Sequence, residues 1–324
     1  MKALIFGISG QDGSYLAQLL LKNRYEVIGV SRDAQSKLFE GLNYLGIRQD
    51  ILIRSAALND FRSVLQVIDD IRPDEIYNLS GQSSVGLSFE LPIETIESIT
   101  LGTINILEAI RFLKRPVKIY NACSSECFGD VGDSVADEQT SFRPKSPYAL
   151  AKAAAYWATA NYREAYSIFT CSGILFNHES PLRKSRFVTQ KIVRAACRIA
   201  HGSDERLYLG NIDIVRDWGW APEYVEAMYL MLQHKSPDDY IIATGKSYSL
   251  TEFVDSAFKY FNLDWRDYVK RKDTLLRPSE ILNSRSNPKK AREILKWQAK
   301  SDMHTVVAMM IEQNLKTDFK NSDA

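Results

Sequence analysis

The chain has 324 residues, of which 45% are hydrophobic and 25% are charged, and its formal net charge at pH 7 is +1. This composition is typical of a globular protein, and the near-zero charge argues against a nucleic-acid or membrane partner, since such polyanionic surfaces attract strongly basic proteins. The four cysteines match neither a disulfide scaffold nor a zinc site, so we expect buried thiols and no metal. An apolar run interrupted by a glycine turn opens the chain, so we expect no secretory leader, no membrane span and a cytoplasmic location.

The first half of the chain alternates short apolar runs with helical patterns. The apolar runs lie at 3–6, 27–30, 51–53, 76–79 and 117–120, and helical patterns between them include 61–71 and 103–113. This alternation is typical of a parallel sheet with helices on both faces. We therefore predict an α/β fold, a Rossmann-like doubly wound parallel sheet.

The alternation becomes looser along the second half. We expect a helix from 148 to about 164, a strand at 168–175, a helix at 187–200, and helices with irregular pieces from about 247. Residues 1–176 and about 207–244 are predicted to form the sheet domain, and residues 177–206 and 245–316 a smaller C-terminal lobe for the substrate. Residues 317–324 are expected to be an unstructured polar tail.

A glycine-rich turn follows the first apolar run. Gly7, Gly10 and Gly13 have the GxxGxxG spacing between a predicted strand and a predicted helix. A tight turn that lets a pyrophosphate approach the backbone requires residues without a Cβ, and the helix N-terminus supplies amide donors. The pattern favours a nicotinamide dinucleotide, and the alternative is a glycine-rich turn without a ligand.

The end of the second predicted strand bears on the choice of dinucleotide. NAD-binding sites usually have a carboxylate there, whereas this chain has Ser31 followed by Arg32. A guanidinium suits the 2′-phosphate of NADP, so we predict NADP rather than NAD. The alternative is that Arg32 is an ordinary solvated charge.

Two residue pairs are candidates for the chemistry. Tyr148 and Lys152 are four residues apart at the start of a helical pattern, so they share a helix face, and the ammonium is expected to lower the pKa of the phenol. Ser124 and Glu126 follow the strand predicted at 117–120, at the ligand-binding edge of the sheet. There the serine can bind a substrate hydroxyl and the glutamate adds an acid/base group. Taken singly, each of these residues is more often an ordinary turn or surface residue.

Taken together, the motifs resemble the GDP-mannose 4,6-dehydratase family in the extended branch of the short-chain dehydrogenase/reductase superfamily. The resemblance covers almost the whole chain except the tail, and NHESP with RDWG is its most specific part. It is carried by GISGQDGSYLAQLLL at 7–21, IYNLSGQSSVGLSFELP at 76–92, SSECFG at 124–129, SPYALAKAAAYWATANYREAY at 146–166, GILFNHESP at 173–181, GNIDIVRDWGWAPEYVEAM at 210–228 and RPSE at 277–280.

The resemblance implies roles for three groups of residues. The catalytic positions are Ser124, Glu126, Tyr148 and Lys152. The cofactor positions, all in the sheet domain except the last two, are Gly7, Ser9, Gly10, Gln11, Asp12, Gly13, Arg32, Leu58, Leu79, Ser80, Gly81, Gln82, Ser83, His178 and Arg183. The nucleotide-sugar positions are Ser84, Asn177, Val188, Lys191, Arg216, Arg277 and Glu280. As bare sequence, Arg216 and Arg277 would more often be surface ion pairs and His178 a structural loop histidine.

The activity that the resemblance implies is a redox-neutral dehydration of GDP-mannose to GDP-4-keto-6-deoxymannose. It implies tightly bound NADP, with Tyr148 taking the O4 proton and Glu126 taking the C5 proton and protonating the leaving C6 hydroxyl. It also implies a homodimer or homotetramer. Alternatives are the same reaction on a GDP-manno-heptose, a C4 dehydrogenase, reductase or epimerase acting on a GDP-sugar, and a dinucleotide-sensing protein without catalysis.

Four positions depart from the family pattern. Ala57 replaces an aspartate expected at the adenine, and Asp33 stands where relatives often have a second arginine, which affects the choice between NADP and NAD. Trp220 and Ser84 replace residues that are commonly histidine or larger, which affects the choice between mannose and heptose.

Overall fold

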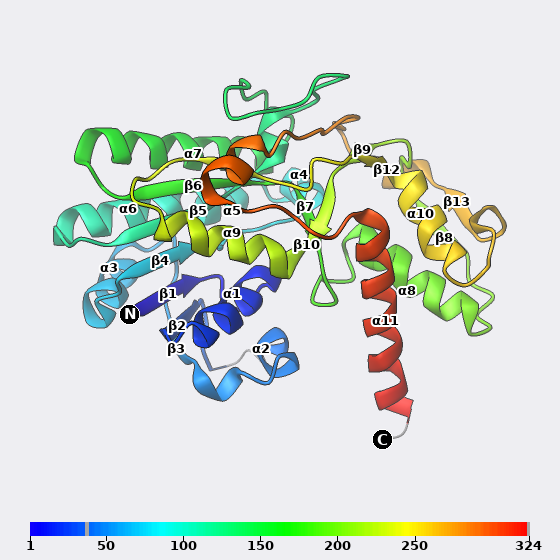
Figure 1. The fold of residues 1–324 in the computed structure, drawn as a ribbon, viewed down its shortest axis with the longest axis horizontal. Coiled ribbons are helices and arrows are strands. Elements are labelled where there is room, and N and C mark those ends of the chain that lie inside the picture. Colours follow the sequence, from blue (N-terminus) through cyan, green and yellow to red (C-terminus); the bar gives the residue numbers. More distant parts are fainter. Residues whose placement is uncertain (36–38, 323–324) are drawn as a thin grey trace.

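A seven-stranded parallel sheet forms the centre of the computed structural model, which describes residues 1–35 and 39–322 (Figure 1). The strand order is β11-β6-β5-β4-β1-β2-β3, and every pairing is parallel. The strands are β1 (Lys2–Phe6), β2 (Glu26–Ser31), β3 (Leu52–Ser55), β4 (Glu75–Asn78), β5 (Lys118–Ser124), β6 (Thr170–Leu175) and β11 (Tyr240–Ile242). The order reverses between β1 and β4, and ligands bind at such a switch point, outside the carboxyl ends of the strands.

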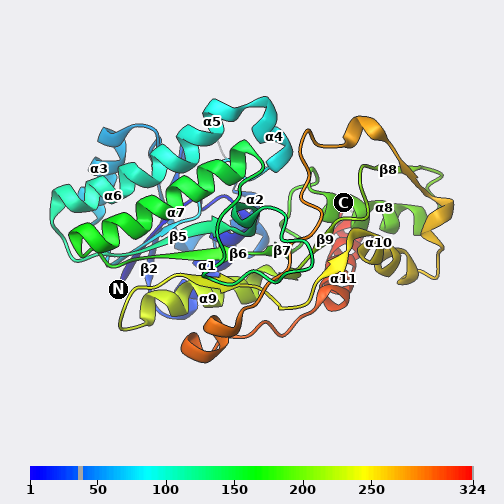
Figure 2. The same ribbon diagram turned by 90° about the horizontal axis from the view of Figure 1, so that it is seen from above.

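Helices cover both faces of this sheet because successive side chains of a strand point to opposite faces. Ala3 and Ile5 pack with α1 (Gln11–Lys22) and α9 (Ala221–Gln233). Leu4 and Phe6 pack with the opposite layer. That layer contains α3 (Phe61–Ile71), α6 (Gly102–Leu113) and α7 (Pro147–Tyr166), which lie side by side in Figure 2. The predicted doubly wound α/β fold is confirmed.

A second apolar core lies at one end of the sheet (Figure 1). It is built by α8 (Val188–Ala200), α10 (Leu250–Lys259), α11 (Met303–Ser322), β8 (Leu207–Leu209) and β13 (Val269–Arg271). Two small strand pairs join this region to the sheet. They are β7 (Asn177–Glu179) with β10 (Trp218–Trp220) and β9 (Val215–Arg216) with β12 (Tyr248–Ser249).

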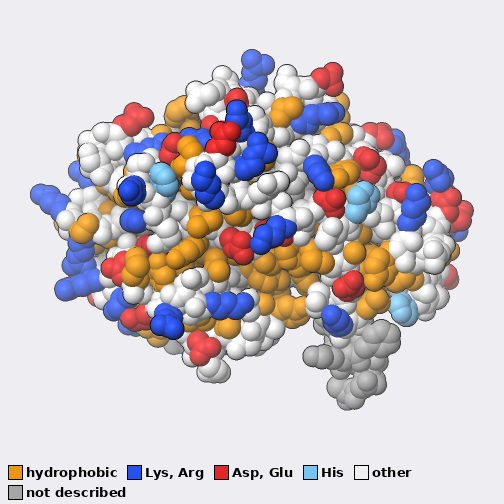
Figure 3. Space-filling model, viewed as in Figure 1, with side chains coloured by type: hydrophobic (Ala, Val, Ile, Leu, Met, Phe, Trp, Pro, Cys, Tyr) orange, Lys and Arg blue, Asp and Glu red, His pale blue; other side chains and the backbone are white. Residues whose placement is uncertain are grey.

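Shorter elements connect these layers. They are α2 (Glu40–Tyr44), α4 (Val85–Glu90), α5 (Pro92–Ile96), η1 (Arg48–Asp50), η2 (Glu97–Leu101), η3 (Ser125–Phe128), η4 (Trp265–Asp267), η5 (Asp273–Leu275) and η6 (Ala291–Leu295). No helix within the described ranges is long and apolar enough to span a bilayer. The four cysteines are free and buried, as predicted. Figure 3 shows acidic and basic side chains interspersed on one face of the molecule, which fits the formal charge of +1.

Two predictions of local structure are wrong. The strand expected at 117–120 continues to Ser124, because the backbone of this segment pairs with β6 up to Leu175. The tail expected to be unstructured from residue 317 is helical as far as Ser322, and 323–324 lie outside the described residues. No glycine or proline interrupts α11, so its backbone hydrogen bonding continues. The division into a sheet domain and a substrate lobe at 176, 206 and 244 stays a prediction.

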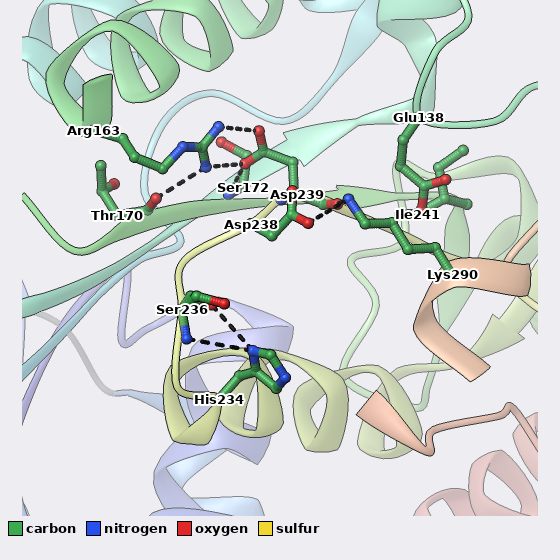
Figure 4. A network of polar contacts seen from close by, with 10 residues as sticks. All are labelled: Glu138, Arg163, Thr170, Ser172, His234, Ser236, Asp238, Asp239, Ile241 and Lys290. Atoms are coloured by element: carbon green, nitrogen blue, oxygen red, sulfur yellow. Dashed lines mark hydrogen bonds and ion pairs between the residues drawn. The ribbon is translucent and has the colours of Figure 1, made fainter. Parts of the chain in front are cut away.

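A network of charges fixes the edge strand of the sheet (Figure 4). Asp239, just before β11, accepts two hydrogen bonds from Arg163 of α7, at 3.0 and 2.6 Å, and a third from the backbone N of Ser172 in β6 at 2.6 Å. Lys290 donates to the carbonyl of Asp239 at 2.9 Å and pairs with Asp238 at 2.7 Å. The network therefore joins three elements of the sheet layer to the segment that leads to α11.

Candidate functional site

The glycine turn connects β1 to α1 in the predicted way. Gly7 has a φ of +87°, and a Cβ on it would lie 2.6 Å from the carbonyl oxygen of Leu79. A Cβ on Gly13 would lie 2.4 Å from the carbonyl oxygen of Gly7, so the folded turn itself requires both glycines. Gly10 is the N-cap of α1, and no side chain caps that helix end. The turn thus presents an uncapped helix N-terminus, which is suited to an anion.

A cavity of about 440 Å³ opens over this turn and the carboxyl ends of β1, β2 and β4. Every residue predicted for the cofactor lines it except His178. Ser31, which the sequence indicated for the choice of dinucleotide, also lines it. So do residues that the sequence did not indicate, namely Phe6, Val30, Ala56, Asn59, Leu87, Glu94, Glu97, Ser98, Leu182, Lys184, Arg186 and Phe187. Several of these lie at or just beyond the carboxyl ends of strands. Their position after a predicted strand is the sequence signal that could have predicted them as cavity residues.

Ser31 and Arg32 form one end of the cavity. Ser31 is buried and its Oγ has no hydrogen-bond partner, so this corner has an unused polar group. The Arg32 side chain is 74% exposed and lies 3.9 Å from a carboxylate oxygen of Glu94 in α5. The corner therefore combines a hydroxyl, an exposed guanidinium and a nearby carboxylate, and these groups can bind a ribose or a phosphate.

Side chains of α1 connect the turn to β7. Gln11 Nε2 donates to the carbonyl of His178 at 3.2 Å, and Ser180 Oγ donates to Gln11 Oε1 at 2.7 Å. The Asp12 carboxylate lies 2.9 Å from Nε2 of His178, and Gln11 Nε2 also donates to Asp12. His178 is buried behind Asp12 and is not part of the cavity wall.

The four predicted catalytic residues converge where β5 meets α7. Ser146 caps α7 by accepting from the backbone N of Ala149 at 3.1 Å, and Tyr148 and Lys152 occupy one face of the first turns. The Tyr148 hydroxyl is hydrogen-bonded with Ser124 at the end of β5. Lys152 Nζ donates to the carbonyl of Ala122 at 2.7 Å and lies 6.0 Å from the centroid of the Tyr148 ring.

The expected effect of Lys152 on Tyr148 is wrong for this structure. Burial raises the pKa of the Tyr148 phenol, and the hydrogen bond with Ser124 opposes this without reversing it. Lys152 is not among the main causes of the shift, and its ammonium donates to the backbone carbonyl of Ala122. Burial also lowers the pKa of Lys152 itself. A buried phenol of this kind holds its proton firmly until another positive charge comes close.

Glu126 lies in η3, directly after the strand that carries Ser124. Its backbone N donates to Ser124 Oγ at 3.3 Å, so the serine that meets Tyr148 also fixes the start of η3. The Glu126 carboxylate interacts electrostatically with both Tyr148 and Arg216. Its charge therefore acts on both the phenol of Tyr148 and the buried guanidinium of Arg216.

Arg216 on β9 is the most unusual charged residue near these groups. It is 3% exposed, and its Nη2 has no hydrogen-bond partner, while Nη1 donates to the carbonyl of Val215 at 2.9 Å. Glu280 lies 3.5 Å from Nη2 of Arg216 and 3.3 Å from Nη1 of Arg277. Burial lowers the pKa of Arg216, and the carboxylates of Glu126 and Glu280 oppose that shift. A buried guanidinium with an unused donor can bind an anion such as a diphosphate.

The other predicted substrate residues lie on β7, on α8 and at the N-cap of α4. Asn177 is the first residue of β7 and Val188 the first of α8. Lys191 of α8 donates to the carbonyl of Tyr208 at 2.6 Å, and Ser84 caps α4 by accepting from Leu87 N at 3.3 Å. A separate hollow of about 310 Å³ is lined by none of the predicted residues. Its walls are Gly210, Asn211, Asp213, Arg271, Lys272, Asp273 and Leu276.

Comparison with known proteins adds two kinds of finding. A family model described as "GDP-mannose 4,6 dehydratase" matches residues 4–310. Curated proteins of similar sequence include GDP-mannose 4,6 dehydratase 2 of Arabidopsis thaliana, which is 45% identical over 97% of this chain and 87% of its own length. GDP-mannose 4,6 dehydratase of Dictyostelium discoideum is 41% identical over 99% and 97%, and that of Vibrio cholerae is 38% identical over 97% and 94%.

Solved structures of more distant proteins share the fold. UDP-glucose 4-epimerase of Thermotoga maritima, crystallised with UDP-glucose, superposes with a TM-score of 0.87 at 20% identity, covering 98% of this chain and 99% of its own. dTDP-glucose 4,6-dehydratase of Bacillus anthracis, in complex with NAD, gives 0.85 at 18% identity, covering 98% and 97%. At these identities the likeness shows the Rossmann-like architecture alone.

Proposed function

Because the chain belongs to the GDP-mannose 4,6-dehydratase family, we propose that it removes water from GDP-mannose and forms GDP-4-keto-6-deoxymannose. The observation that carries this proposal is the convergence of a phenol, a carboxylate and a buried guanidinium at the end of β5. Tyr148 is hydrogen-bonded with Ser124, and the charge of Glu126 acts on both Tyr148 and Arg216. A generic dehydrogenase needs the phenol, whereas an elimination also needs a second acid/base group beside it.

A nicotinamide dinucleotide fits the cavity over the glycine turn. The uncapped N-terminus of α1 suits the pyrophosphate, and the unpartnered Oγ of Ser31 suits the adenosine ribose or its phosphate. When bound, the cofactor accepts a hydride from the sugar and returns it within the same turnover, and its oxidised nicotinamide carries positive charge. A positive charge near Tyr148 would lower the pKa of the phenol, which burial alone raises.

The residues of the chain then supply the proton transfers. Tyr148 accepts the proton of the sugar O4 as C4 is oxidised, and Ser124 holds the phenol in place. The resulting 4-keto group makes the C5 proton acidic, and Glu126 removes it. Glu126 then gives that proton to the C6 hydroxyl as it leaves, so water departs. As hydride returns to C6, the proton that Tyr148 took from O4 passes to C5, which restores both side chains. Lys152 fixes α7 against β5 through the carbonyl of Ala122.

NADP is the proposed form of the cofactor. The end of β2 has a hydroxyl and a guanidinium in place of a carboxylate, and Arg32 is exposed enough to turn toward a 2′-phosphate. Glu94 competes for Arg32, and it is the feature that could favour NAD instead. Dissociation constants for NADP and NAD, measured side by side, test this: a tighter NAD complex contradicts the assignment.

The nucleotide end of the substrate is assigned to the group around Arg216. Its Nη2, which has no hydrogen-bond partner and lies 3.5 Å from Glu280, suits the diphosphate of GDP together with Arg277, and the Glu280 carboxylate suits ribose hydroxyls. Asn177, Val188, Lys191 and Ser84 are proposed to complete the site. The lobe division predicted from sequence would then separate the cofactor from most nucleotide contacts.

Self-association is proposed through the helices α5, α6 and α7. This layer exposes large apolar side chains, with Ile93 at 67%, Phe112 at 66%, Trp157 at 61% and Leu150 at 52% exposed. Exposed apolar groups on adjacent helices suit a second copy of the chain. Sedimentation of wild type and Trp157→Glu tests this, and a monomeric wild-type protein contradicts it.

Mass spectrometry tests the activity. The protein is incubated with NADP and GDP-mannose, and in parallel with a GDP-manno-heptose, and a product lighter by one water is expected from GDP-mannose. Loss of water from the heptose alone would move the assignment to that sugar. Net formation of NADPH, or inversion at C4 without loss of water, would identify a C4 dehydrogenase or epimerase and refute the dehydratase.

A further inference from the structure

His178 is buried with a hydrogen-bond acceptor at each ring nitrogen. Its Nδ1 lies 2.7 Å from the carbonyl oxygen of Phe176, and its Nε2 lies 2.9 Å from a carboxylate oxygen of Asp12. The ring stacks on Tyr224 of α9, with centroids 4.6 Å apart and an angle of 24° between the planes. The imidazole is thus held on both edges and on one face.

When Asp12 is ionised, this geometry favours a proton on each ring nitrogen. A carbonyl oxygen can only accept, so Nδ1 must donate to Phe176. An ionised carboxylate also only accepts, so Nε2 must donate to Asp12, and the ring is then an imidazolium. Burial alone would lower the pKa of His178, but the charge and hydrogen bond of Asp12 and the carbonyl of Phe176 outweigh it and raise the pKa. Burial would likewise raise the pKa of Asp12, but His178 outweighs it and lowers the pKa.

Asp12 occupies a place where negative charge is unfavourable for the proposed cofactor. It lies in the first turn of α1 and in the wall of the cavity, between Gly10 and Gly13. Two phosphates at this helix end would face the carboxylate across a partly desolvated cavity, where like charges repel more strongly than in water. His178 does not line the cavity, and its ring reaches the cavity wall through the contact of Nε2 with Asp12.

We propose that His178 is a positioning residue whose second proton is required for tight dinucleotide binding, because the imidazolium neutralises Asp12 at the pyrophosphate end of the cavity. The inference rests on the dinucleotide site proposed above. Loss of the proton leaves the Asp12 carboxylate uncompensated, and the affinity for the cofactor falls.

Other charged and titratable groups face this pair from the neighbouring elements. Arg183 acts on both His178 and Asp12, and it is itself paired with Glu179 at 3.2 Å. The charge of Asp12 acts electrostatically on Lys152 of α7 and Tyr120 of β5, and Tyr224 stacks on the His178 ring. Burial raises the pKa of both tyrosines far from the neutral range, so neither changes charge there.

The test measures the dissociation constants of NADP and NAD by calorimetry from pH 6.5 to pH 9. NAD is included because it lacks the 2′-phosphate, whose own ionisation near pH 6 affects NADP binding. For wild type, both constants should rise above the pKa of His178, approaching about tenfold per pH unit, as expected for one linked proton. Asp12→Asn removes the charge that needs compensation, so its affinity should vary little with pH.

Two further variants separate charge from structure. His178→Gln keeps a hydrogen-bond donor without the positive charge, and it should bind both cofactors weakly at every pH. The double variant with Asp12→Asn should regain affinity close to that of wild type at pH 6.5, because no unpaired charge remains. A merely structural role of His178 would instead leave the double variant as weak as His178→Gln, which would overturn the proposal.

Nuclear magnetic resonance gives a readout without any ligand. The chain has four histidines, and comparison with His178→Gln assigns the ¹⁵N signals of His178. Both ring nitrogens should carry protons at pH 7, and a neutral ring there overturns the proposal. If cofactor binding depends on pH equally in wild type and in Asp12→Asn, the proposal is also overturned. If wild type binds neither cofactor at pH 6.5, the proposed dinucleotide site itself fails; if it binds them with no pH dependence, the inference about His178 fails alone.

Discussion

Replacement of Arg216 by methionine is expected to weaken GDP binding far more than it weakens the fold. Arg216 is 3% exposed, its Nη1 donates to the carbonyl of Val215, and its Nη2 has no hydrogen-bond partner and lies 3.5 Å from the Glu280 carboxylate. One or two charge-assisted hydrogen bonds to a diphosphate from that nitrogen contribute about 3 kcal/mol in total. Their loss raises the Kd for GDP roughly 150-fold, since about 1.4 kcal/mol corresponds to a factor of ten. Isothermal titration with GDP measures this directly.

Arg277→Met is the matched control, because it removes the same group from the same carboxylate. The Arg277 side chain is 34% exposed, so water screens its charge, and its loss should cost about 1 kcal/mol, roughly fivefold in Kd. Methionine retains the apolar stem in both variants, and Glu280 keeps one guanidinium partner in each. Thermal unfolding by circular dichroism checks that both variants fold. A Kd for Arg216→Met within about threefold of wild type, or a larger effect at Arg277, would refute the assigned role of the buried guanidinium.

Three further predictions concern catalysis, stability and pH. Glu126→Gln should keep its affinity for GDP and lose at least about a hundredfold in elimination rate, since general acid–base catalysis contributes roughly 10²- to 10⁴-fold; unchanged release of water in single-turnover mass spectrometry would remove Glu126 from the mechanism. Asp239→Ala leaves Arg163, whose side chain is 19% exposed, without the carboxylate that accepts two of its hydrogen bonds. Urea unfolding should show that the free energy of unfolding falls by about 3–5 kcal/mol. A fall below about 1 kcal/mol contradicts the role of the network in Figure 4. The pKa of His178 is raised above 6.5, so its contribution to stability is complete below pH 6.5 and is lost as the pH rises through the raised value. The pKa of Asp12 is lowered below 3.8, so its contribution is complete above pH 3.8 and is lost as the pH falls through the lowered value. The difference in unfolding free energy between wild type and Asp12→Asn should therefore be greatest between pH 3.8 and 6.5, and a difference that stays constant from pH 4 to pH 9 contradicts the charged pair.

Most of the sheet could be predicted because its signals are local. The helix expected at 61–71 has those bounds in the structure, since Asp60 caps its first turn and Arg72 ends it in the left-handed conformation. The strand β11 was not predicted, because three apolar residues carry no period that distinguishes a strand from a loop. Its position depends on Asp239, which meets Arg163 from a distant part of the chain.

The candidate site was predictable in its residues but not in its electrostatics. The spacing of Tyr148 and Lys152 places both on one helix face, as expected, yet it says nothing of burial, which raises the pKa of the phenol. Glu94 reaches Arg32 only because α5 folds over the end of β2, and no short-range pattern indicates that contact. Sequence patterns thus indicate which residue types lie close together, while burial and neighbouring charges in the folded protein determine their pKa values.

The contacts that prepare the cofactor end of the site also hold the second core against the sheet. Asp12 and His178 are 166 positions apart, and with the bond between Ser180 and Gln11 they join β7 to the first turn of α1. A ligand that binds only when these contacts are intact stabilises the fold by mass action. Variants in this contact should therefore change dinucleotide affinity and thermal stability together. Variants of Ser124 or Glu126, which belong to one local segment, should change turnover without a matching change in thermal stability.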